Sequence, residues 1–179
     1  KPLIRRKILP DLIRLYNIMK QKKIAYMGLF AAIAIIFGYV ESLIPFFAGI
    51  PGIKLGLANL AVLFILERYS LKEATLVSAV RILVIGFMFG NMFSILYSMA
   101  GAALSLTVMT LMKRFSGFSI LGVSVAGGVS HNIGQLIIAA LIVENTSLFY
   151  YAPVLLISGV ITGILIGILT GEVTKRIHL

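Results

Sequence analysis

Residues 71–90 read LKEATLVSAVRILVIGFMFG, a mostly apolar segment that carries Arg81 near its middle. A run of about 20 mostly apolar residues is long enough to cross the hydrocarbon core of a bilayer as a helix. A central arginine costs such a helix about 2.5 to 3.5 kcal/mol, so it normally faces the interior of a bundle, where a side chain, carbonyl, water or ligand pairs with it. The segment therefore predicts both a membrane-spanning helix and a buried polar site.

The composition of the whole chain agrees with this reading. Of the 179 residues, 60% are hydrophobic and 12% are charged, and the mean hydropathy is +1.06. These values are far from those of average soluble domains and indicate an integral membrane protein with room for about six crossings. The sequence contains no cysteine, which excludes disulfides and thiolate metal sites.

Short polar breaks divide the apolar sequence into segments of helical length. They predict an all-α membrane protein, a bundle of six transmembrane helices. The second segment is short, and we expect a tilted or partly re-entrant element packed against protein, because irregular backbone at membrane depth must be shielded from lipid. The predicted spans are 24–44, 55–67, 71–90, 92–112, 117–143 and 149–171.

The N-terminal segment 1–23 carries eight of the sixteen lysine and arginine residues, with apolar residues between them. This pattern predicts a basic amphipathic arm that lies at the lipid headgroups, with Pro10 starting or interrupting its helix. The predicted organisation is thus an arm at 1–23, a six-helix transmembrane domain at 24–175 and a cytoplasmic tail at 176–179.

Lysine and arginine also orient the predicted bundle. Fourteen of them fall on one side, Lys54 alone lies in an opposite-side loop, and Arg81 lies within the membrane. The positive-inside rule then places both termini of this cell-membrane protein in the cytoplasm. The net charge of +10 is mostly a topology signal with some attraction to anionic lipid, and we expect no nucleic-acid partner.

Polar residues within or beside the spans could line one cavity that opens away from the cytoplasm. Thr75, Ser78 and Arg81 are spaced by three and form a stripe on one helix face, which predicts that this face points inward. The sequence SHNIGQ places two amides and a histidine close together on another span. The predicted substrate-binding residues are Glu41, Lys54, Asn59, Arg81, Asn91, Tyr97, His131, Asn132 and Gln135.

Other roles are open for the same residues. Arg81 could be neutralised by Glu41 or Glu144, and Glu41 could form a loop ion pair with Lys54. Serine and threonine in spans commonly bond to backbone carbonyls. His131 has no second histidine within the spans, so we expect no metal centre.

Glycine marks a further pattern on the last span, where Gly159, Gly163, Gly167 and Gly171 recur every four residues. Small residues at this spacing let helix backbones approach closely in lipid, and packing inside the bundle is the favoured interpretation over a groove for a partner. On the first span, a second narrow face could dock a partner helix. Its residues are Ala25, Gly28 and Ala32.

Four segments carry a family resemblance: ESLIPFFAGIPGIKLGLANLAVLF (41–64), AVRILVIGFMFGN (79–91), LYSMAGAALSL (96–106) and GGVSHNIGQL (127–136). The chain resembles, over roughly 24–175, the Gx transporter family, also labelled heptaprenyl diphosphate synthase component I. That family is similar to the substrate-binding S components of energy-coupling factor (ECF) transporters.

The resemblance implies a membrane subunit that captures a small vitamin-like molecule, or a lipid or quinone precursor, outside the cell. It implies partners as well: a transmembrane T subunit and two cytoplasmic ATPases, docked at the face around Gly28 and Ala32. The 41–59 loop would act as a gate over the pocket.

The residues themselves limit the chemistry of the chain. They include no phosphate-binding Gly-x-x-x-x-Gly-Lys-Ser/Thr loop, so another subunit must supply any ATP coupling. Prenyl synthases hold magnesium and diphosphate with an aspartate-rich motif, but this chain has one aspartate, Asp11. We therefore expect neither enzymatic activity nor a cofactor. The alternative function is a non-catalytic membrane anchor or accessory protein of isoprenoid or quinone biosynthesis.

Overall fold

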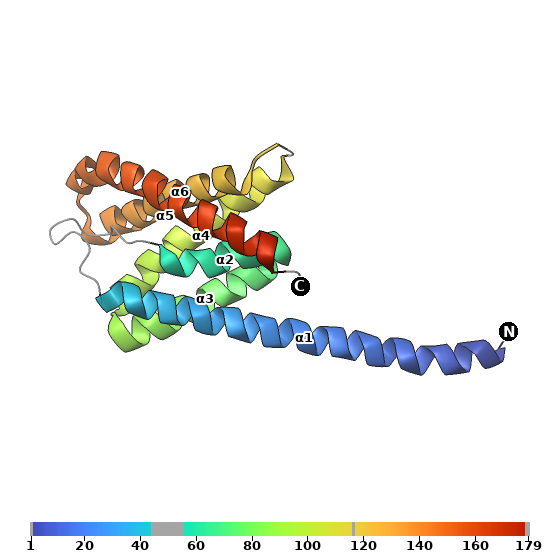
Figure 1. Ribbon diagram of the computed structural model, residues 1–179. Coiled ribbons are helices and arrows are strands. Elements are labelled where there is room, and N and C mark those ends of the chain that lie inside the picture. Colours follow the sequence, from blue (N-terminus) through green and yellow to red (C-terminus); the bar gives the residue numbers. More distant parts are fainter. Residues whose placement is uncertain (1, 44–55, 116, 178–179) are drawn as a thin grey trace.

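A computed structural model describes residues 2–43, 56–115 and 117–177, and within these ranges the chain is helical with no strand (Figure 1). Six α-helices follow one another, and a short 3-10 helix, η1, precedes the last of them. Their bounds are α1 Pro2–Leu43, α2 Leu57–Arg68, α3 Leu71–Phe89, α4 Met92–Arg114, α5 Ile120–Val143, η1 Thr146–Tyr151 and α6 Ala152–Arg176.

The first helix is longer than the sequence predicts. α1 runs unbroken for 42 residues, through Pro10 and across position 23, where we expected the arm to end and the first span to begin. Residues 20–27 (KQKKIAYM) contain neither glycine nor proline, the residues that most readily end a helix. The N-terminal half extends away from the bundle as a continuation of the span (Figure 1).

The short helix α2 is enclosed by the others. Its 12 residues span about 18 Å, less than the roughly 30 Å of a bilayer core, and six consecutive residues from Ala61 to Leu66 are buried. The rings of Phe30 on α1 and Phe64 on α2 pack with centroids 4.7 Å apart. The prediction of a short element packed against protein is confirmed.

Four segments are long and apolar enough to cross a membrane: Arg14–Leu43, Met92–Arg114, Ile120–Val143 and Thr146–Arg176. The third helix differs from these because it has only 19 residues, so any stretch of it long enough to cross the membrane contains all three of its charged residues, Lys72, Glu73 and Arg81. The six predicted segments thus all form helices, and four of the six meet the criteria for a span by themselves. The chain is a membrane protein.

Glycine brings α4, α5 and α6 into close contact. A Cβ built on Gly163 of α6 would lie 2.6 Å from the Cα of Val125 on α5, and one built on Gly159 would lie 2.9 Å from the carbonyl oxygen of Gly128. On the other side of α5, a Cβ on Gly134 would lie 2.8 Å from the carbonyl oxygen of Ala100. The glycine ridge of the last span therefore serves packing inside the bundle over most of its length.

The two ends of the bundle, where the helices begin and end, differ in character. At the basic end, Lys23 pairs with Glu73 at 2.5 Å, Lys113 pairs with Glu67 at 3.2 Å, and Arg68 donates to the last carbonyls of α6. The cavity end is the opposite one, where α1 stops and α4 begins (left in Figure 1). The polar contacts at the basic end involve five of the six helices.

Candidate functional site

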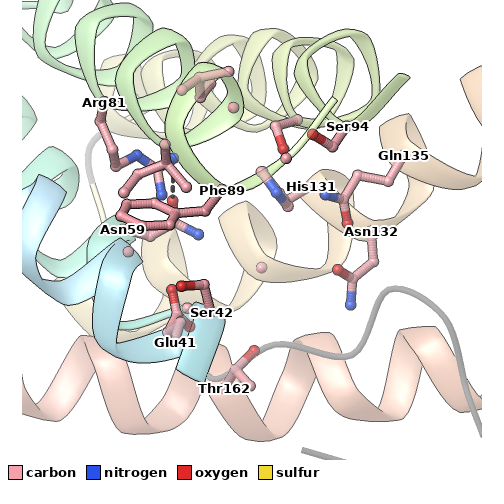
Figure 2. Close-up of a pocket in the computed structure, with 18 residues that line it drawn as sticks. Glu41, Ser42, Asn59, Arg81, Phe89, Ser94, His131, Asn132, Gln135 and Thr162 are labelled. Carbon is pink, nitrogen blue, oxygen red and sulfur yellow. Dashed lines mark hydrogen bonds between the residues drawn. The ribbon is translucent and has the colours of Figure 1, made fainter. Parts of the chain in front are cut away.

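A cavity of about 180 Å³ lies among the helices at the cavity end, and all six α-helices contribute to its wall (Figure 2). Its lining is unusually polar for the interior of a membrane bundle. The polar side chains that line it are Glu41, Ser42, Asn59, Arg81, Ser94, Ser98, His131, Asn132, Gln135 and Thr162.

Arg81 supplies the positive charge of this cavity. Its Nη2 donates a hydrogen bond to Oδ1 of Asn59 on α2, 3.2 Å away, as the dashed line in Figure 2 shows. Its Nε is buried and has no hydrogen-bond partner among the described residues. A buried donor without an acceptor costs about 1 to 3 kcal/mol, so the guanidinium retains binding capacity that the described residues do not use.

Glu41 supplies the negative charge, but it does not lie within ion-pair distance of Arg81. One carboxylate oxygen accepts a hydrogen bond of 3.1 Å from the backbone N–H of Leu57, the first residue of α2. The amino end of a helix carries partial positive charge and stabilises a carboxylate there. Glu41 is thus held by a helix end, which leaves the guanidinium of Arg81 available to a ligand.

The wall opposite Arg81 comes from α5. His131, Asn132 and Gln135 lie there on neighbouring turns (Figure 2), and the two amide side chains are buried. Gly101 on α4 makes room for them, because a Cβ at this position would lie 2.7 Å from Cγ of Gln135. Nδ2 of Asn132 donates to the carbonyl oxygen of Leu155, 2.7 Å away, and ties α5 to α6.

Six of the nine predicted binding residues therefore line one cavity. Asn91 and Tyr97 are not among its lining residues. Asn91 caps α4, its side chain accepting from the Ser94 N–H at 2.8 Å, and Tyr97 packs on Phe93 with ring centroids 6.0 Å apart. Lys54 and most of the predicted gate lie outside the described residues.

The polar stripe predicted on the third span is only partly correct. Arg81 and Ser78 point into the bundle, but Thr75 is exposed, because three residues advance a helix by less than a full turn and the stripe drifts around it. Carboxylates Glu41 and Glu144 were both possible partners for Arg81. Of these, only Glu41 lines the cavity.

Several lining residues have no counterpart in the sequence prediction. Ser42 follows Glu41 at the end of α1, Phe89 ends α3, and Thr162 lies beside Gly159 and Gly163 on α6. The hydroxyl of Thr162 also bonds to the carbonyl of Ser158 at 2.9 Å. In the sequence, Thr162 is marked only as a polar residue on the helix that its glycines bring close to α5.

The predicted docking face on α1 is open. Ala25, Gly28 and Ala32 are all exposed, and a Cβ on Gly28 would have no described neighbour within 4 Å. The same is true at Gly171, beyond the packed part of the glycine ridge. These small residues therefore do not serve helix packing among the described residues.

The arrangement of these side chains suits the binding of a ligand better than catalysis. The cavity offers one guanidinium, one carboxylate, one imidazole, three amides and several hydroxyls, which can recognise a polar or anionic group. Within the described ranges, no three His, Asp or Glu side chains lie close enough to hold a metal ion.

Comparison with known proteins gives one match. The family model for heptaprenyl diphosphate synthase component I matches residues 30–173, which include the last part of α1, the whole of α2 to α5 and most of α6. Neither the curated proteins nor the solved structures give a match. With four-fifths of its length covered by the family model, the chain belongs to the heptaprenyl diphosphate synthase component I family.

Proposed function

We propose that this chain is a membrane-embedded substrate-binding subunit that holds a small anionic molecule at Arg81 for uptake into the cell. The observation that carries this proposal is the buried Nε of Arg81 in a polar cavity, where no described group accepts a hydrogen bond from it. An acidic ligand would supply that acceptor. It would also neutralise a charge that is costly at membrane depth.

The geometry of the cavity supports a ligand rather than a structural ion pair. Glu41 is held by the N–H of Leu57, and Asn59 satisfies only one donor of the guanidinium. Charge-assisted hydrogen bonds from arginine to a carboxylate or phosphate are short and often bidentate. The amides of Asn132 and Gln135 on the facing wall would then form hydrogen bonds with the rest of the molecule.

Uptake requires an energy source outside this chain. The resemblance to ECF substrate-binding subunits supports a separate module of a transmembrane T subunit and cytoplasmic ATPases. The exposed small-residue face of Ala25, Gly28 and Ala32 would dock on it, because small residues permit close helix contact in lipid. By the positive-inside rule, the basic end faces the cytoplasm and the cavity opens outside.

The proposal is tested by native mass spectrometry of gently purified protein. We expect one small molecule per chain, and we expect Arg81→Gln to lose it while the protein keeps its helical content and unfolds cooperatively. Arg14→Gln is the matched control, because it removes the same charge from an exposed position outside the cavity. Absence of a bound molecule from the parent protein, or its retention by Arg81→Gln, would contradict the proposal.

The family description favours a second candidate function, a non-catalytic membrane component of heptaprenyl diphosphate synthesis. The N-terminal half of α1 extends away from the bundle and is strongly basic, so it could hold a soluble synthase at the membrane (Figure 1). Co-purification with a prenyl synthase that is lost on deletion of 1–23, with no ligand in the cavity, would favour this function.

A further inference from the structure

A second, smaller cavity of about 40 Å³ adjoins the first. The two share five lining residues, so they meet at a common boundary. Those residues are Gly56, Asn59, Gly128, His131 and Thr162. We call the larger space the head chamber and the smaller one the tail chamber.

The tail chamber extends from the shared boundary toward the basic end. On α2, Val62 and Leu63 follow Asn59 by about one turn in that direction. On α4, Leu106 and Met109 follow Ser98 by two to three turns. The tail chamber therefore lies deeper in the bundle than Arg81 and its anion-binding groups.

The two chambers differ in chemistry. Arg81, Glu41 and the side chains of Asn132 and Gln135 line the head chamber alone. Apart from the shared residues, the tail chamber is lined by aliphatic side chains, methionine, glycine and three serines. Its residues beyond the boundary are Val62, Leu63, Ser78, Ala102, Ser105, Leu106, Met109, Ser124, Gly127, Gly163 and Ile166.

We propose that the ligand is an anionic amphiphile: its acidic head binds Arg81, and a short, mainly aliphatic tail enters the tail chamber between Gly128 and Asn59. This inference rests on the proposed binding function and narrows its substrate class. A single compact acid would leave the tail chamber unused. A uniformly polar ligand would place polar groups against Val62, Leu106 and Ile166.

The size of the tail chamber limits the tail. A cavity of about 150 Å³ lined by aliphatic and aromatic side chains can accommodate benzene. At about 40 Å³, the tail chamber accepts only a few carbon atoms. Met109 lines the chamber beside Gly127, and a Cβ built on Gly127 would lie 2.5 Å from Sδ of Met109. Methionine side chains adapt readily to the shape of their neighbours.

The inference is tested with monoalkyl phosphates and the corresponding carboxylates carrying one to five carbons, by calorimetric titration of the detergent-solubilised protein. In the series whose head group Arg81 binds, affinity should rise about fourfold for each methylene that enters the tail chamber. It should fall once the tail exceeds the space. Arg81→Gln should lose binding of every member of the series.

Two variants change the space in opposite directions. Ala102→Leu should shorten the best-binding tail, and Met109→Ala should lengthen it by at least one carbon, because each residue lines the tail chamber. Leu111→Ala, an exposed position on the same helix, is the matched control and should keep the parent profile. If one variant fails to fold, the other alone tests the direction of the shift.

The outcomes separate this inference from the function on which it rests. The two-chamber ligand would be overturned if binding through Arg81 did not depend on tail length, or if the parent and both variants preferred the same tail length. Either result would leave the binding function intact. Failure of every probe to bind, together with the absence of a co-purifying molecule, would overturn both.

Discussion

The guanidinium of Arg81 on α3 is joined to the side-chain oxygen of Asn59 on α2 by a hydrogen bond of 3.2 Å. α2 is the short, enclosed helix, and its first backbone N–H also binds Glu41. The same short helix thus positions both charged groups of the cavity. Substitutions of Asn59 should separate the stabilising role of this bond from ligand binding.

We predict that Asn59→Asp weakens anion binding at least tenfold while the protein remains folded. A carboxylate at this position would pair with Arg81 directly and satisfy the charge that the ligand is proposed to satisfy. Asn59→Ala should instead destabilise the protein by about 1 to 3 kcal/mol, since it leaves a buried donor unpaired. Binding and thermal unfolding of the two variants, measured side by side, test this contrast. Tight binding by Asn59→Asp would show that Arg81 does not hold the anion.

Glycine packing gives a second prediction. Gly163→Ala should lower the unfolding temperature clearly, because its new methyl group would meet the backbone of Val125 at 2.6 Å. Gly171→Ala on the same helix is the control and should change the temperature little, since a Cβ there would meet no described side chain or neighbouring helix within 4 Å. Equal effects of the two substitutions would contradict the close packing of α6 on α5.

The open face of α1 gives a third prediction. Gly28→Leu should leave the unfolding temperature of the isolated protein within about 2 °C of the parent, because Gly28 is exposed and a Cβ there has no described neighbour within 4 Å. It should nevertheless prevent co-purification with a transport module. Ala34→Leu, at a fully buried position on the same helix, should destabilise the protein itself and serves as the contrast. Undiminished module binding by Gly28→Leu would exclude this face as the docking surface.

Membrane orientation can be measured directly because the chain contains no cysteine. We expect Tyr150→Cys, at an 87% exposed position at the cavity end, to react with a membrane-impermeant thiol reagent added to intact cells. Arg14→Cys, on the extended part of α1, should react only after the cells are opened. The reverse pattern would place the cavity toward the cytoplasm and exclude uptake from outside.

Much of the fold was predictable from sequence because lipid imposes strong constraints on composition. Runs of apolar residues predicted six helices near the observed positions, and the short α2 was expected to pack against protein. The continuity of α1 was not predicted, since the change from basic to apolar residues near 23 marks a change of surroundings and not of backbone structure.

The site was predictable in part for a related reason. Arg81, Asn59 and the α5 cluster stand out because polar groups are rare in apolar helices. Asn91 is also polar, but it caps α4. Asparagine is common at the start of helices, so its presence there does not by itself indicate a binding site. The tail chamber has no signal of its own in the sequence, because ordinary core residues line it and only the crossing of the helices creates the space.

The central claim is that an acidic small molecule binds the unused donor of Arg81. Its most direct test is an experimental structure of the protein purified with whatever molecule it retains. We predict an acceptor oxygen of that molecule at about 2.7 to 3.2 Å from Nε of Arg81. Pairing of that Nε with a protein side chain, in a cavity filled by neighbouring residues, would contradict the account.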